Sequence, residues 1–444
     1  MYIIYSLFLT IAFILMAPLF LLRTDKYASG FRQRLGNYPD FENKRGPVIW
    51  LHCVSVGETN AARPLVDRIT EEFPGIRIIV STTTRTGQEL AQKVFADNSD
   101  AIFYFPFDWK FSVTKALEHF KPTAVLLMET EIWPRFIREA KRSDVKIVVV
   151  NGRLSERSAR RYSKGGAFIR SVLANIDLAL MQAVPDAQRI VTLGMQPTGT
   201  KVTGNLKFDQ QPSIDESGLS LELRDRFDIS RNRPLIIAAS THAPEESWIL
   251  EAFAECLIDP PHPKPRLLIA PRHPERFAEV AELARSFGVI THRNFRPFSV
   301  VRRSNIESDS DKIADVILLD TIGELRAAYR LAEIVFVGGS MIPHGGQSVL
   351  EPGSAGKATV TGPYTHNFDE VVRTFVENSA LIQLSETRHE RVVDDIFLAF
   401  SDLLEDSEAR NAIGRNALSV MNANKGATAK TVAELRELLR RNSI

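Results

Sequence analysis

The sequence has few cysteines. Only Cys53 and Cys256 occur among its 444 residues. Two thiols cannot build a disulfide framework or a cysteine-based zinc site, and so small a number is typical of a protein kept in a reducing compartment.

An excess of charge of one sign is also missing. The 55 basic and 54 acidic residues give a formal net charge of +1 at pH 7. Proteins that bind duplex nucleic acid usually carry clustered Lys and Arg on a strongly basic face. We therefore expect no nucleic-acid partner, and any polyanionic ligand must be bound by local groups.

An internal repeat of 20 to 50 residues is not apparent either, which excludes a solenoid. The sequence does contain 44% hydrophobic and 25% charged residues, the balance of an ordinary globular protein. At this length we expect two α/β domains with buried cores.

The first 22 residues carry no charged side chain. About 20 apolar residues can cross a bilayer as a helix, so residues 1–22 are expected to form a membrane anchor. A cleaved signal peptide would need basic residues before the apolar run, but here they follow it: Arg23, Lys26, Arg32 and Arg34. The positive-inside rule then predicts a single-pass protein whose other domains are cytoplasmic. The alternative is a buried core helix, which normally keeps a polar face.

Residues 23–208 alternate short β-branched runs with longer amphipathic segments. The runs are VIWLHCV, IRIIVST, AIFYFPF, TAVLLM and VKIVVVN, and IDLALMQA and KVTGNLKFD close this half. Such alternation predicts parallel strands joined by crossover helices, a Rossmann-like domain. Residues 209–220 are polar without a period, so we expect a linker there.

Residues 221–444 repeat the pattern with the runs RPLIIAAST, PRLLIAPRHP, VILLD, IVFVGGS and ATVTGP. The expected fold class is therefore α/β, with two Rossmann-like domains facing a central cleft. Ligands of open α/β sheets bind beyond the carboxyl ends of the strands, so the residues that end each run form the candidate site.

The stretch PHGGQSVLEP, residues 343–352, is the strongest candidate in the second half. Gly345 and Gly346 allow backbone N–H groups to approach a ligand, and a helix expected from Ser348 would direct its positive end at a phosphate. Glu351, one turn into that helix, could accept hydrogen bonds from ribose hydroxyls. The alternative is that the glycines serve only a turn.

Other strand ends of this half supply a polar rim. Arg272 can hold phosphate oxygens bidentately. His273 and His344 are either phosphate donors or packed histidines, and the sequence leaves both possibilities open. The segment DTIGEL could place a nucleobase against backbone groups. The ligand-site candidates are Ser240, Thr241, Arg272, His273, Ile322, Gly323, Glu324, Gly345, Gly346, Ser348 and Glu351.

In the first half, Glu58 follows the VIWLHCV run, where a general base would face the cleft. Because proline fits the first turn of a helix, Pro64 predicts a helix that starts near Ala61, with Glu58 in the preceding loop. The alternative is that this carboxylate only stabilises a helix N-terminus. Glu129 and Glu131 end another strand, and Glu129 is the second catalytic candidate.

A basic cluster follows the VKIVVVN run and contains Arg153, Arg157, Arg160, Arg161 and Lys164. Such a run is usually a solvated face, but on a membrane-anchored protein it can also meet anionic headgroups or a phosphorylated lipid. Asp309 and Asp311 match a D-x-D metal pattern. They lie in a polar stretch before a strand, so we expect a loop and no metal site.

Several long blocks resemble bacterial 3-deoxy-D-manno-octulosonic acid (Kdo) transferases, which are glycosyltransferases of the GT-B fold. The blocks run in the same order along nearly the whole chain: WLHCVSVGETNAARPL, FPFDW, METEIWP, NGRLSERS, GNLKFD, STHAPEE, APRHPERF, DTIGEL and GGSMIPHGGQSVLEPGSAGKATVTGPYTHNF. Blocks of this length are far more specific than a glycine motif.

The resemblance implies transfer of Kdo from CMP-Kdo to a lipid A precursor at the inner face of the inner membrane, with inversion and without a metal or cofactor. It also implies that Glu58 is the catalytic base. Arg272 and the Gly345 to Gly346 loop would hold the CMP phosphate, and Glu351 would bind ribose. The chain departs from the more common HGGHNPLEP of the family, because Gln347 and Ser348 replace its His and Asn.

Two rival functions remain open at this point. One is another GT-B enzyme, either a heptosyltransferase or a nucleotide-sugar epimerase. The other is a membrane-anchored sensor that binds a nucleotide sugar without turnover.

Overall fold

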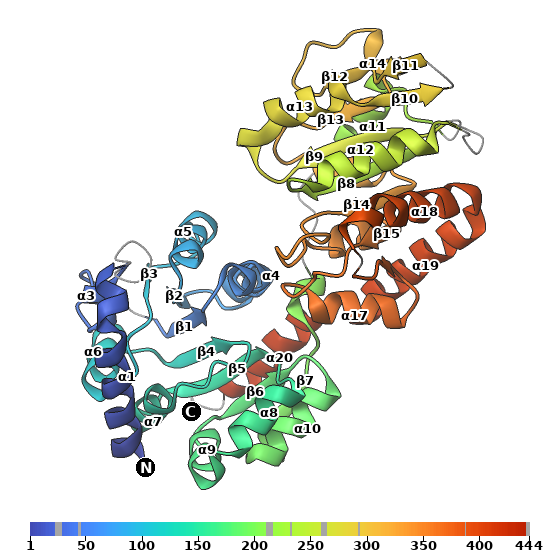
Figure 1. Cartoon of the computed structure of the whole chain (residues 1–444). Coiled ribbons are helices and arrows are strands. Elements are labelled where there is room, and N and C mark those ends of the chain that lie inside the picture. The colour runs from blue at the N-terminus through green and yellow to red at the C-terminus, as the bar shows by residue number, and fades with distance from the viewer. Residues whose placement is uncertain are drawn as a thin grey trace. The chain divides into compact units, whose positions relative to one another are not determined.

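The computed structural model describes residues 1–22, 29–42, 46–209, 216–230, 233–258, 264–291, 294–386 and 388–440. The chain divides into two compact units (Figure 1). The first unit is Met1–Gln211 together with Asn424–Ile444, and the second unit is Pro212–Ala423.

A seven-stranded parallel sheet forms the centre of the first unit, in the order β3-β2-β1-β4-β5-β6-β7. Val48 and Trp50 of β1 join one apolar cluster, while Ile49 and Leu51 join the cluster on the opposite face. Both faces are therefore buried, as is usual for a parallel sheet. The strands are β1 (Val48–Cys53), β2 (Arg77–Thr82), β3 (Ala101–Tyr104), β4 (Ala124–Met128), β5 (Lys146–Gly152), β6 (Leu178–Met181) and β7 (Thr200–Val202).

Crossover helices connect these strands, as the alternating pattern predicted. The KVTGNLKFD segment, which closes this half of the chain, forms the short strand β7 and then a 3-10 turn. The helices are α4 (Val56–Glu72), α5 (Arg85–Val94), α6 (Lys110–Phe120), α7 (Pro134–Arg142), α8 (Glu156–Ser163), α9 (Gly166–Leu173) and α10 (Val184–Leu193), with the 3-10 turns η1 (Pro197–Gly199) and η2 (Leu206–Asp209).

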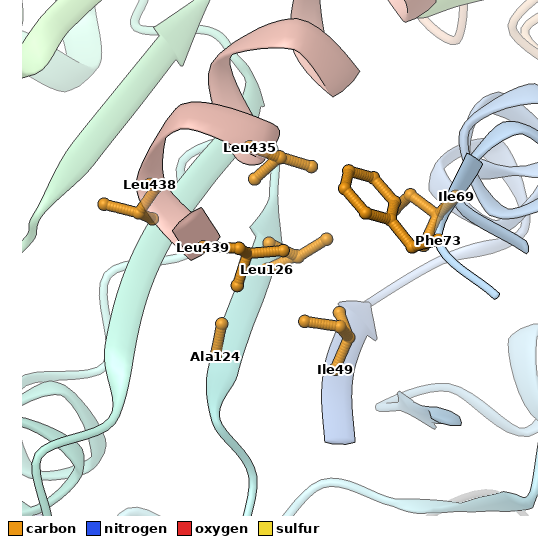
Figure 2. Close-up of a pocket in the computed structure, with 8 residues that line it drawn as sticks. All are labelled: Ile49, Ile69, Phe73, Ala124, Leu126, Leu435, Leu438 and Leu439. Carbon is orange, nitrogen blue, oxygen red and sulfur yellow. The ribbon is translucent and has the colours of Figure 1, made fainter. Parts of the chain in front are cut away.

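The last helix, α20 (Ala427–Arg440), belongs to the first unit, a point that the sequence left open. Figure 2 shows Leu435 and Leu439 of α20 facing Phe73 and Leu126 of the first unit. The gap between them is about 10 Å³ and is lined by apolar side chains alone. An apolar gap of this size holds neither ligand nor water, so it is not a binding site. The apolar side chains around it pack α20 against the sheet.

The N-terminal helix α1 (Tyr2–Leu22) packs against α7, and the short helix α3 (Phe31–Arg34) follows it. The contact uses polar groups: the Tyr5 hydroxyl donates to Asp108 at 2.8 Å, and the Arg135 guanidinium donates to the Ser6 hydroxyl at 2.9 Å.

The exposed residues between Tyr2 and Leu15 of α1 are all large and apolar: Ile3, Ile4, Leu7, Phe8, Ile11, Ile14 and Leu15. Among the described residues, none of the helices is long and apolar enough to cross a membrane. The expected spanning anchor therefore finds no support. Two of the basic residues expected to flank it, Arg23 and Lys26, lie outside the described residues.

The second unit contains another seven-stranded parallel sheet, in the order β12-β13-β9-β8-β14-β15-β16, and a separate antiparallel pair, β10 and β11. The sequence pattern missed β12 and β16 because both are very short edge strands. The strands are β8 (Leu235–Thr241), β9 (Arg266–Pro271), β10 (Gly288–Thr291), β11 (Asn294–Pro297), β12 (Val300–Arg302), β13 (Val316–Leu318), β14 (Ile334–Val337), β15 (Ala358–Thr361) and β16 (Ile382–Gln383).

Part of the expected linker, residues 209–220, is folded. Residues 210–215 lie outside the described residues, but α11 begins at Glu216, and the Ser220 hydroxyl donates to the Ala327 carbonyl at 2.8 Å. The helices of this unit are α11 (Glu216–Arg226), α12 (Glu245–Cys256), α13 (Phe277–Ser286), α14 (Ser310–Ile313), α15 (Leu325–Tyr329), α16 (Leu350–Ser354), α17 (Asp369–Glu377), α18 (Val392–Glu405) and α19 (Ser407–Asn424), with the 3-10 turns η3 (Pro274–Arg276) and η4 (His389–Arg391).

Candidate active site

Glu58 lies in the first turn of α4, just beyond the carboxyl end of β1. The expected helix start near Ala61 was wrong, because α4 begins directly after Ser55 and includes Pro64. A capping box explains the early start. The Ser55 hydroxyl accepts from the Glu58 N–H at 3.5 Å, and the Glu58 carboxylate accepts from that hydroxyl at 3.0 Å and from the Val54 N–H at 2.8 Å.

The Glu58 side chain is largely buried, since the residue is 6% exposed. Burial and then the negative charge of Glu129 raise its pKa to about 8, with a smaller contribution from Glu131. The hydrogen bonds from Val54 and Ser55 lower the pKa but do not cancel this rise. A carboxyl group with a pKa near neutrality can take up or release a proton under physiological conditions.

Glu129 follows β4 directly and has a left-handed backbone, with φ 54°. The ammonium group of Lys207, on η2, lies 3.6 Å from a Glu129 carboxylate oxygen. Burial raises the pKa of Glu131, and the charge of Glu129 raises it further. The carboxyl edge of the first sheet thus brings together three interacting carboxyl groups and one cation, as the strand-end rule predicted for the acids.

A buried glutamate organises the carboxyl edge of the second sheet. Glu245, at the start of α12, accepts hydrogen bonds from the N–H groups of Gly339, Ser340 and Met341 at 2.7 to 2.9 Å and from the His242 N–H at 3.0 Å. Burial raises the pKa of Glu245, and these four bonds oppose the rise. The carboxylate therefore fixes the turn after β14 to the end of β8.

Gly345 and Gly346 lie in the loop beyond this turn, with φ values of 94° and 73° that favour glycine. A Cβ atom at Gly345 would lie 2.3 Å from the side-chain nitrogen of Asn367, so that side chain would have to move to admit it. The helix expected from Ser348 begins instead at Leu350 and has five residues. So short a helix supplies little macrodipole to a ligand.

Two carboxylates expected to bind a ligand are ion-paired. Glu351 receives hydrogen bonds from Arg326 of α15, at 2.9 and 3.0 Å. Glu324 is paired in the same way with Arg303, at 2.8 Å. A ribose hydroxyl at Glu351 must therefore share the carboxylate with a guanidinium. Two further ligand-site candidates from the DTIGEL segment, Ile322 and Gly323, lie in the exposed loop before α15.

Arg272 follows β9 and is exposed. In the part of the chain that the structure describes, its guanidinium has no acidic partner, whereas the nearby Arg276 is bound to the buried Glu246 at 2.6 Å and to Glu279 at 2.7 Å. Arg272 is thus the cation that is available to an incoming anion.

Three imidazole rings lie close together at the carboxyl edge of the second sheet. The ring of His242 lies 5.3 Å from that of His273 and 4.7 Å from that of His344, measured between centroids. Burial lowers the pKa of His242, and the two neighbouring rings lower it further. His273 and His344 are exposed, which favours ligand contact over a place in the core. Ser240 is left-handed, with φ 55°, and the adjacent Thr241 is fully buried.

Comparison with known proteins identifies the family. Residues 29–210 match the family described as 3-deoxy-D-manno-octulosonic-acid transferase (kdotransferase). The chain is 33% identical over 420 residues to the 3-deoxy-D-manno-octulosonic acid transferase of Haemophilus influenzae, a match that covers 95% of this chain and 94% of that protein. The chain belongs to the Kdo transferase family.

Further comparisons agree with this result. The Kdo transferase of Bordetella pertussis is 31% identical over 396 residues, covering 88% of this chain and 87% of that protein. A solved UDP-GlcNAc 2-epimerase from Neisseria meningitidis has a TM-score of 0.55 at 15% identity, covering 88% of this chain and all of that chain (100%). At this identity the likeness shows a shared GT-B-like fold of two parallel sheets and nothing about activity.

The basic residues predicted to meet the acceptor or the membrane lie in and around α8. The basic cluster spans α8 and the residues on either side of it. Arg157, Arg160 and Arg161 on the helix are exposed, as is Lys164 directly after it, and Arg160 pairs with Glu156 at 2.5 Å. Arg153 lies in the preceding loop and is half-buried. No group of three metal-ligating side chains occurs among the described residues.

The D-x-D segment differs from the expected loop. Asp311 lies in the short helix α14 and is 2% exposed, because it forms a buried ion pair with Arg226 at 2.8 Å. The carboxylate therefore has a structural partner in place of a metal.

The sequence pattern missed three residues that contact the candidate site: Ser55, Lys207 and Glu245. The S-x-x-E spacing of Ser55 and Glu58 was a readable capping signal. Lys207 stands in the GNLKFD block, five residues after the end of β7. Glu245 follows the strand RPLIIAAST by four residues, but nothing in the sequence indicates that it binds the turn after another strand.

Proposed function

We propose that this Kdo transferase moves Kdo from CMP-Kdo onto a hydroxyl of a lipid A precursor, with inversion at the anomeric carbon and with Glu58 as the general base. The observation that supports Glu58 is its buried carboxyl group at the carboxyl edge of the first sheet, whose pKa is raised to about 8. Such a base is strong enough to accept the hydroxyl proton in the transition state and is still partly ionised at neutral pH.

The second unit is proposed to hold the donor. As the bond from the anomeric carbon to the CMP phosphate breaks, negative charge develops on the phosphate. Arg272 is the first candidate to stabilise that charge, because it is exposed and its guanidinium can bind two oxygens at once. The Gly346 N–H is a weaker candidate, since it already donates to the Gly339 carbonyl at 2.8 Å. His273, Glu324 and Glu351 complete the proposed donor site, with Glu351 near the ribose.

Glu129 is proposed to act through Glu58. Its negative charge raises the pKa of Glu58 and so keeps that carboxylate basic. The 3.6 Å contact with Lys207 holds Glu129 in place and partly offsets its charge. The two acids therefore have different roles: one accepts the proton, and the other adjusts the strength of the base. We expect neither a metal nor a cofactor to take part, since protein cations can supply the positive charge.

The lipid acceptor requires a place where an insoluble substrate and a soluble donor meet. We propose the cytoplasmic face of the inner membrane, with α1 as the attachment. The exposed side chains of α1 between Tyr2 and Leu15 are all apolar. Its other side is fixed to the first unit by Tyr5 and Ser6. A helix held in this way fits attachment along the membrane surface. The exposed arginines of α8 can attract anionic headgroups.

Replacement of Glu58 by Gln tests the function. Gln keeps the size of the side chain and removes its basicity. We expect CMP binding to stay nearly unchanged and CMP release, measured with CMP-Kdo and a lipid A precursor, to fall roughly 10²-fold or more. Near-normal turnover would exclude Glu58 as the base. A wild-type protein that binds CMP-Kdo but forms no heavier lipid would be a sensor rather than an enzyme.

A further inference from the structure

A groove runs along α1 on the first unit. It has a volume of about 830 Å³ and is open to solvent on one side. Ser6 and Thr10 of α1 line one wall. The other is lined by Trp109, directly before α6, and by four residues of α6: Lys110, Phe111, Thr114 and Lys115. Its volume lies within the range of roughly 300 to 1,000 Å³ that is typical of sites for small molecules.

The wall at α6 combines two aromatic rings with two lysines. The rings of Trp109 and Phe111 stack with centroids 5.8 Å apart and planes inclined by 13°. Phe111 is 51% exposed, although its side chain is wholly apolar. Lys110 and Lys115 are exposed at the same groove, and no acidic partner of either ammonium group is recorded within the described ranges. This combination suits a ligand with a long apolar part and an anionic group.

The groove is anchored to the loop that carries the catalytic acids. Arg135 lines the groove at the start of α7, four residues after Glu131. The Asp108 carboxylate accepts hydrogen bonds from the N–H groups of Arg135 and Phe136 at 2.9 and 2.6 Å, which ties the end of β3 to the end of β4. Both segments lie at the carboxyl edge of the sheet, the same edge that presents Glu58.

The wall formed by α1 is held by polar contacts. The Trp109 indole donates to the Thr10 hydroxyl at 3.1 Å, and the Arg135 guanidinium donates to the Ser6 hydroxyl. Leu7 and Ile14, three residues before and four residues after Thr10, neighbour Thr10 on the surface of α1 and expose large apolar side chains. The groove is thus continuous with the surface that we propose to lie on the membrane, and a lipid could enter it without leaving an apolar environment.

We propose that this groove receives an acyl chain of the acceptor lipid and that Lys110 and Lys115 contact one of its phosphates. The inference rests on the proposed function, because it assigns a subsite to the same acceptor. Acyl-chain contact in the groove would hold the glucosamine part of the acceptor at the edge where Glu58 stands. The groove therefore makes the enzyme selective for an acylated, phosphorylated acceptor.

Binding can be measured by quenching of tryptophan fluorescence. A lipid A precursor with a brominated acyl chain is added to the full-length protein in mixed micelles. The expected result is quenching that is lost in Trp109→Phe and is relieved by unbrominated precursor but not by an equal amount of phosphatidylglycerol. Quenching that does not depend on Trp109 would overturn the proposal. Equal relief by phosphatidylglycerol would also overturn it, because the groove would then be a general phospholipid site.

Kinetics separate the groove from the catalytic function. Phe111→Glu places a charge where the acyl chain would lie, so the KM for the acylated acceptor should rise about tenfold, with little change in the KM for CMP-Kdo. The conservative Phe111→Leu should raise the KM for the acylated acceptor much less. On a deacylated disaccharide acceptor, the wild type and Phe111→Glu should behave alike.

The two lysines of the groove can be tested against a lysine outside it. Lys110→Glu with Lys115→Glu should raise the acceptor KM by about tenfold, while Lys93→Glu, on the exposed side of α5, should not. If the wild type turns over and these groove variants keep its acceptor KM, the groove proposal fails and the function stands. If the wild type releases no CMP with any acceptor, the proposed function itself fails.

Discussion

The carboxylate of Glu58 accepts a hydrogen bond from the Val54 backbone N–H at 2.8 Å. It also accepts one from the Ser55 hydroxyl, so the group proposed as the base also supports the N-cap of its own helix. The two roles compete, because proton transfer from a substrate hydroxyl needs a free oxygen lone pair on this carboxylate. Each oxygen has two lone pairs, and the two recorded bonds leave some of them available.

The pH dependence of catalysis should report the ionisation of Glu58. Since its pKa is raised to about 8, only about a tenth of the protein is in the ionised form at pH 7. We expect kcat/KM to rise with pH from 6, to reach about half of its plateau near pH 8 and to level off above about pH 9. Initial rates of CMP release between pH 5.5 and 9.5 provide the measurement. A profile that is flat from pH 6 upward would contradict the raised pKa.

Neutralising Glu129 should shift that profile. Glu129→Gln removes the largest charge contribution to the raised pKa of Glu58, so the rise in kcat/KM should move to lower pH. The activity at pH 6.5 should then be closer to its plateau than in the wild type. The control is Glu118→Gln, which changes an exposed glutamate of α6 in the same unit. An unchanged midpoint in Glu129→Gln would show that the two acids do not interact.

The raised pKa of Glu58 should also cost stability at high pH. Its folded pKa lies above the ordinary value of 4.5, so its contribution to stability is fully present below about pH 4.5 and is lost as the pH rises through 8. Glu58→Gln lacks this loss. Its free energy of unfolding, relative to the wild type, should increase by about 3 to 4 kcal/mol between pH 5 and pH 8. Denaturant titrations at the two pH values measure it, and a constant difference would refute the prediction.

Most of the two sheets could be predicted because buried parallel strands are continuous apolar runs. The runs VIWLHCV and RPLIIAAST each contain one central strand, β1 and β8. The start of α4 could not be placed from Pro64 alone. One lost backbone hydrogen bond inside a helix was outweighed by the capping box at Ser55 and by burial of the apolar face of the helix.

The site was less predictable than the sheets because its geometry depends on partners that are distant in the sequence. Residue type and strand-end position identified Glu58, Glu129 and Arg272 as candidates. The ion pair between Arg326 and Glu351 and the hydrogen bonds of Glu245 depend on which strand ends become neighbours in the sheet. No local pattern carries that information.

Replacement by Gln should have different effects at Arg272 and at Arg276, on CMP binding at the first and on stability at the second. Arg272→Gln removes an exposed cation, so CMP binding should weaken by about tenfold or more while the Tm stays close to that of the wild type. Arg276→Gln leaves the carboxylate of Glu246, which is fully buried, without its partner, and should lower stability by about 3 kcal/mol. Isothermal titration with CMP and thermal unfolding measure the two effects. A loss of stability in Arg272→Gln, or wild-type CMP affinity in that variant, would remove Arg272 from the donor site.

Glu245→Gln should loosen the turn after β14 without changing any group that we expect to touch the donor. A carboxylate accepts all four N–H bonds that reach this position, whereas Gln turns an NH₂ group toward two of the donors. Leaving such buried N–H groups unpaired should cost about 2 to 4 kcal/mol of unfolding free energy and weaken CMP binding, because the glycine loop follows this turn. Glu251→Gln, on the exposed side of the same helix, is the matched control and should leave both quantities unchanged. If Glu245→Gln is as stable as the wild type, the buried carboxylate does not organise the loop, and the donor site must be held by other contacts.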